Sequence, residues 1–63
     1  MNLQMSAEEI LYMIINRLDG LYNWLEQNKG KRGFSQNITS AENKILAYRD
    51  MYYAITGQEY VKK

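Results

Sequence analysis

The chain has 63 residues and a net charge of +1, and it contains no cysteine, no histidine and no proline. A domain of this size buries a small fraction of its surface, and the missing cysteine and histidine exclude disulfides and most transition-metal sites. We therefore expect no metal and no cofactor, and we expect association with another surface to contribute stability. The near-neutral charge argues against a dedicated binder of polyanions.

The first residues carry no basic segment followed by an apolar run, so no secretory signal is predicted. No stretch approaches the roughly 18 apolar residues that a membrane-spanning helix requires. We therefore expect residues 1–63 to form one small helical domain in the cytoplasm, without a membrane partner.

A first helix is predicted over residues 7–28. Ser6 is a favourable N-cap, and Glu9, three positions later, completes a capping box. Gly30 can adopt the left-handed conformation that commonly follows the last turn of a helix. The helix is therefore expected to begin directly after Ser6 and to end shortly before Gly30.

The apolar residues of this first helix form two neighbouring stripes. Each stripe has the alternating spacing of three and four residues that is typical of a bundle interface. A helix that packs against one neighbour needs one stripe, so two stripes predict two partner surfaces. The first stripe is Leu11, Ile14, Leu18, Leu21 and Leu25, and the second is Ile10, Met13, Arg17, Gly20 and Trp24.

The second stripe is the strongest candidate for an interface. Trp and Arg are frequent energetic anchors of protein-protein contacts, and Gly20 is expected to leave a notch beside them. The alternative is that Trp24 completes the protein's own core while the aliphatic part of Arg17 lies along it.

Residues 29–38 are predicted to form a loop that contains a basic cluster. Lys29, Lys31 and Arg32 lie around two glycines, and exposed amides beside three cations are a candidate contact for a phosphate, a nucleic acid or an acidic protein surface. The spacing does not match a Walker loop, and the connection is too long for a helix-turn-helix. A solvated loop without a ligand is the alternative.

A second helix is predicted over residues 39–56, followed by a tail at residues 57–63. Thr39 with Glu42 forms a capping box, although Ser40 could be the N-cap instead, and Gly57 is expected to end the helix. In the tail, Tyr60 and Val61 are expected to fold back and Lys62 to be solvated. The apolar stripe of this helix is Ile38, Ala41, Ile45, Tyr48, Tyr52 and Ile55.

Three tyrosines of the second helix, Tyr48, Tyr52 and Tyr53, are further candidate interface residues. Stacking on nucleic-acid bases would require more interleaved basic residues than the helix offers. The alternative is that the rings pack inside a small bundle with their hydroxyl groups at its rim.

The apolar stripes of the two helices match, and the helices are similar in length. They predict an all-α fold, an antiparallel two-helix hairpin that dimerises into a four-helix bundle. We expect a homo-oligomer, with a dimer favoured, and also a protein partner. A partner-dependent monomer is the alternative, since a stripe does not identify the surface that it packs against.

No catalytic residues are predicted. The commonest general base and the best nucleophile are absent from the sequence, and the carboxylates fall on polar helix faces. We therefore expect a small non-enzymatic interaction module that binds and modulates, including by inhibition, a partner protein. In size and composition the chain resembles small accessory proteins of bacteria and their phages. The alternatives are a nucleic-acid-associated protein that uses the basic loop, and a structural subunit of a larger assembly.

Overall fold

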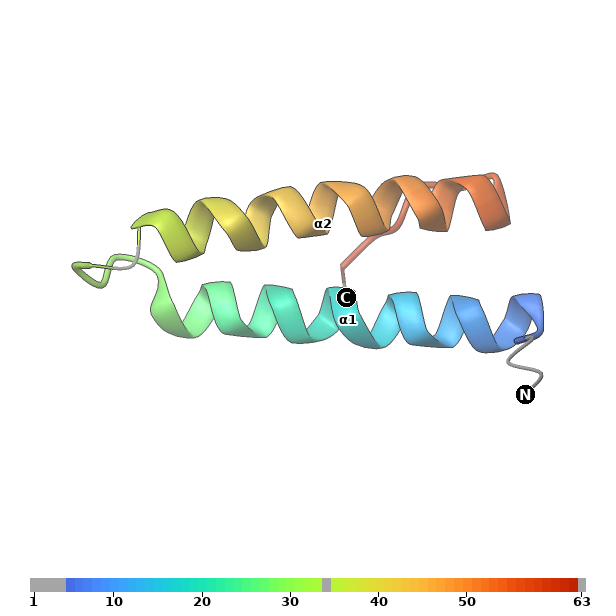
Figure 1. Ribbon diagram of the computed structural model, residues 1–63, viewed down its shortest axis with the longest axis horizontal. Coiled ribbons are helices and arrows are strands. Elements are labelled where there is room, and N and C mark those ends of the chain that lie inside the picture. Colours follow the sequence, from blue (N-terminus) through green and yellow to red (C-terminus); the bar gives the residue numbers. More distant parts are fainter. Residues whose placement is uncertain (1–4, 34, 63) are drawn as a thin grey trace.

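The computed structural model describes residues 5–33 and 35–62. These residues form two helices and no strand: α1 (Ala7–Asn28) and α2 (Ser35–Thr56). The helices are 22 residues each and lie antiparallel, side by side, as a helical hairpin (Figure 1). Within the described ranges, neither helix combines the length and the apolarity needed to cross a membrane.

The ends of α1 lie where its capping residues indicate. Ser6 Oγ accepts a hydrogen bond from the Glu9 backbone N–H at 3.1 Å, and the Ser6 hydroxyl donates to the Glu9 carboxylate at 3.2 Å. At the other end Gly30 has a φ of +83°, and the Lys31 N–H donates to the Asn28 carbonyl at 3.2 Å. Both ends of α1 therefore have partners for backbone or capping groups.

The predicted start of the second helix was wrong. α2 begins at Ser35, so the connection is residues 29–34 and not 29–38. Thr39 does not cap the helix, because its hydroxyl lies inside the first turns and donates to the Ser35 carbonyl at 3.0 Å. Gln36 and Asn37 in the additional turn are polar and exposed, so the apolar pattern does not reveal that the helix extends N-terminal to Ile38.

The end of α2 agrees with the prediction from Gly57. This glycine has a φ of +73°, and its N–H donates to the Tyr53 carbonyl at 2.7 Å. After it the chain turns back and runs toward the middle of α1 (Figure 1).

The core is a single layer between the two helices. Four side chains are buried among the described residues, and α1 and α2 contribute two each. The surrounding partly buried side chains include tyrosines from both helices and from the tail. Ile55, at the end of the predicted stripe of α2, is 41% exposed and lies outside this core. The buried residues are Ile14, Leu18, Ala41 and Ile45.

Candidate interaction surfaces

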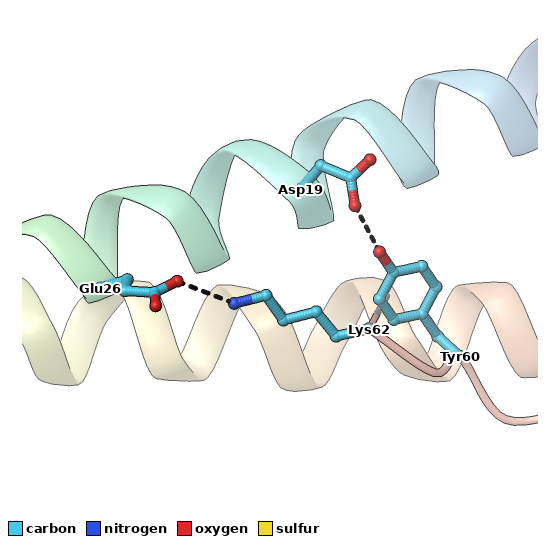
Figure 2. A network of polar contacts seen from close by, with 4 residues as sticks. All are labelled: Asp19, Glu26, Tyr60 and Lys62. Atoms are coloured by element: carbon cyan, nitrogen blue, oxygen red, sulfur yellow. Dashed lines mark hydrogen bonds and ion pairs between the residues drawn. The ribbon is translucent and has the colours of Figure 1, made fainter.

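The segment after α2 covers one face of the hairpin. Its turn is held at Thr56, whose hydroxyl donates to the Tyr52 carbonyl at 2.8 Å and accepts from the Gln58 N–H at 3.1 Å. Two side chains beyond this turn, those of Tyr60 and Lys62, then reach α1 (Figure 2). We call Gln58–Lys62 the tail.

Tyr60 makes the central contacts of the tail. Its ring stacks on Tyr22 with a centroid distance of 6.1 Å and an interplanar angle of 11°, and it meets the ring of Tyr52 edge-on at 5.4 Å. Its hydroxyl donates to the carboxylate of Asp19 (Figure 2). This hydrogen bond, together with burial and the negative charge of Asp19, raises the pKa of the Tyr60 phenol to about 12.

Lys62 makes the second contact of the tail with α1. Its Nζ lies 3.2 Å from a carboxylate oxygen of Glu26 and 5.4 Å from the centroid of the Tyr22 ring. Val61, between the two contacting residues, is 77% exposed. Tyr60 therefore packs against the helices as expected, and Lys62 is exposed as expected but also forms an ion pair, whereas Val61 lies in the returning segment with its side chain exposed.

The residues that receive the tail are placed by helical spacing. Asp19, Tyr22 and Glu26 follow one another at intervals of three and four, so they form one line along α1, and Tyr52 of α2 borders this line. We call these four residues the tail site. The sequence does not reveal these four residues as a set, because Asp19 and Glu26 resemble ordinary solvated carboxylates.

On the opposite side of the hairpin, both helices carry apolar side chains that no segment of the described chain covers. The guanidinium carbon of Arg17 lies 6.0 Å from the centroid of the Tyr48 ring, so the second stripe of α1 lies beside this side of α2. Three apolar side chains stay accessible here: Met13 is 36% exposed, Met51 49% and Ile55 41%. We call this surface the open face, and it comprises Met13, Arg17, Gly20, Trp24, Lys44, Tyr48, Met51 and Ile55.

The structure divides the predicted interface residues into two groups. Met13, Arg17, Gly20, Trp24 and Tyr48 lie on the open face, as the helical spacing and the Arg17–Tyr48 contact place them. The others do not join them. These are Ile10 and Tyr52, which pack against the core, and Tyr53, which is 54% exposed and borders Leu46 at another edge of α2.

Gly20 is exposed, and a Cβ atom added there would meet nothing within 4 Å. No other element of the described hairpin packs against it, and a role of this position as a notch for a partner stays a prediction. Trp24 is half-buried, and it borders a shallow groove with Ala41 and Lys44 near the loop end of the open face.

The basic loop is accessible to solvent. Lys29, Lys31 and Arg32 are all exposed, and the glycines between and after them have positive φ angles. Lys29 also borders a groove that contains Glu26 and Glu42, so one of the three cations faces carboxylates of the protein itself. Contact of this loop with a phosphate or a nucleic acid stays a prediction.

In the part of the chain that the structure describes, no group of three or more acidic, histidine or cysteine side chains is placed to hold a metal ion. Comparison with protein-family models, with curated proteins and with solved structures finds no match to this chain. The geometry of the two faces therefore carries the functional argument.

Proposed function

We propose that this chain is a small, non-enzymatic protein-protein interaction module. In this proposal two copies pack through their open faces into a four-helix bundle, and the surfaces left outside bind and modulate a partner protein. The observation that carries the proposal is the open face, on which Met13, Met51 and Ile55 stay between 36% and 49% exposed. Apolar side chains gathered in this way mark interaction sites, and two further helices would bury both stripes.

The thin core supports the same conclusion. A layer of four buried residues is small even for a chain of 63 residues, and chains of this size commonly need a disulfide, a metal or association. Burial of the open face against a second copy would add apolar contact area and would stabilise the folded state by mass action.

The experiment is sedimentation velocity over a series of protein concentrations, with two matched variants. Met51→Asp places a charge on the open face, whereas Leu46→Asp places the same charge on the other side of α2, at a residue that is 61% exposed. We expect the wild-type chain and Leu46→Asp to dimerise and Met51→Asp to stay monomeric with unchanged helix content. A wild-type chain that is folded and monomeric throughout the series would contradict the homodimer.

A second candidate partner for the open face is an acidic amphipathic helix of another protein. The charged members of the open face, Arg17 and Lys44, are both cations. Two copies would bring like charges toward one another, whereas an acidic helix would be complementary. Binding of a designed acidic amphipathic peptide that weakens with added salt and with Arg17→Glu would favour this candidate, and binding that ignores both changes would contradict it.

A further inference from the structure

The contacts of the tail are made by side chains on a short segment. Outside the helices, no hydrogen bond between two backbone groups is found after Gly57 in the described residues. The tail is held to α1 through the side chains of Tyr60 and Lys62. Contacts of this kind depend on the side chains that arrive at the tail site. They do not depend on which copy of the chain delivers them.

The tail site itself is built from regular helix. Asp19, Tyr22 and Glu26 lie within α1 and Tyr52 lies within α2, so their spacing is set by the two helices and not by the tail. The site offers two carboxylates and two aromatic rings, which match a tyrosine followed two residues later by a lysine. In an extended segment, residues two apart project to the same side, as Tyr60 and Lys62 do here while Val61 between them is exposed.

The connection between α2 and the tail is short and contains a flexible residue. Gly57 has a φ of +73°, and two residues separate it from Tyr60. Glycine adopts several backbone conformations at low cost, so a change at Gly57 that also releases the Thr56–Gln58 hydrogen bond can redirect the tail away from its own helices. Exchange of an identical segment between two copies is a low-cost route to association.

We propose that the tail site is an interaction surface for the tail of a second copy of this chain. Tyr60 and Lys62 of one copy occupy Asp19, Tyr22, Glu26 and Tyr52 of the other, through the same contacts that they make within one chain. Within a chain the tail occupies its own site at an effective concentration of about millimolar, so it acts as a competitive cover. This inference does not rest on the open-face dimer, because the two surfaces are separate.

Complementary variants test the exchange. An acceptor chain carries Tyr60→Ala and Lys62→Ala, which disable its tail and leave its site intact. A donor chain carries Asp19→Ala, Tyr22→Ala and Glu26→Ala, which remove most contacts of its site and leave its tail intact. Both also carry Met51→Asp, so that an open-face dimer cannot contribute. We expect a one-to-one mixture to form a complex by sedimentation velocity, while each variant alone stays monomeric.

A charge exchange supplies the specificity control. An acceptor with the additional change Glu26→Lys is expected to bind the donor about fivefold more weakly, and a donor with the additional change Lys62→Glu is expected to recover this loss. Absence of a complex between folded acceptor and donor, or a complex that ignores this exchange, overturns the proposal.

A labelled peptide with the sequence of residues 57–63 gives a second measurement. Fluorescence anisotropy is expected to show binding to the acceptor at least about tenfold tighter than to the wild-type chain, whose site is already occupied. If the acceptor is unfolded by circular dichroism, the peptide is expected to restore its helix content. Equal binding to both chains, or no restoration, contradicts the proposal.

Discussion

The hairpin has a tail face, which is the side that carries the tail site, and the open face on its other side. Both are rich in aromatic and apolar side chains, but only the tail face is covered by another segment of the described chain. On the tail face, Tyr60 fills the space between Tyr22 and Tyr52, and Lys62 pairs with Glu26. On the open face, the methionines Met13 of α1 and Met51 of α2 stay exposed. The difference is that the described chain supplies a covering segment on one side of the hairpin and none on the other.

The largest expected effect comes from removal of the cover. Tyr60→Ala deletes a half-buried ring with two aromatic neighbours and a hydrogen bond, and should lower the free energy of unfolding by about 2–3 kcal/mol. Tyr12→Ala is the control, because Tyr12 lies on α1 away from the tail and is 71% exposed, and it should change stability by less than about 0.5 kcal/mol. Urea unfolding followed by circular dichroism measures both. Equal losses in the two variants would show that the tail does not stabilise the hairpin.

A smaller effect is expected from the phenol hydroxyl alone. Tyr60→Phe keeps the ring but removes the hydrogen bond to Asp19, and should cost about 1 kcal/mol at neutral pH. The folded pKa of Tyr60, about 12, lies above the ordinary value near 10, so the protonated phenol stabilises the folded state. This contribution is complete below the unfolded pKa and is lost as the pH rises toward and through 12.

The measurement is the difference in unfolding free energy between the wild-type chain and Tyr60→Phe as a function of pH. The difference should stay constant up to about pH 9 and then shrink. Ultraviolet titration provides the matching readout, since the phenol of Tyr60 should ionise at a pKa of about 12 and this phase should be missing in the variant. If the difference in unfolding free energy grew with pH, protonation of the Tyr60 phenol would not be what stabilises the folded state.

The smallest effect is expected from the ion pair. Lys62 and Glu26 are 41% and 73% exposed in their side chains, so solvent screens their attraction, and Lys62→Met should cost less than about 1 kcal/mol. Lys31→Met, at an exposed lysine of the loop, is the matched control. Salt should reduce the wild-type advantage over Lys62→Met but should not change the comparison with Lys31→Met. If Lys62→Met lowered the free energy of unfolding as much as Tyr60→Ala, the ion pair and not the Tyr60 ring would be the main contact of the tail.

The sequence predicted the helices where a local signal exists. Ser6 with Glu9, Gly30 and Gly57 each act within one turn of a helix, so the residues around them determine the end. The start of α2 had no such signal, because Thr39 imitates a cap while it donates to the Ser35 carbonyl inside the helix. A hydroxyl that bonds to its own helix and one that caps it look the same in a sequence.

The candidate surfaces were only partly predictable for a different reason. The stripe that contains Met13, Arg17 and Trp24 follows from helical spacing alone, and it lies on the open face as a group. The tail site depends on where a segment without secondary structure returns, and neither periodicity nor capping specifies that path. Asp19 and Tyr60 are 41 positions apart, and no local pattern relates them.

The placement of the tail site across two helices has a kinetic consequence. Tyr60 contacts Asp19 and Tyr22 of α1 and Tyr52 of α2, and these side chains come together only when the helices pair, so Tyr60 should dock after α1 and α2 have paired. A contact made after the transition state slows unfolding and leaves the folding rate nearly unchanged. The tail therefore determines how long the folded hairpin persists once formed, whereas the helices determine how fast it forms.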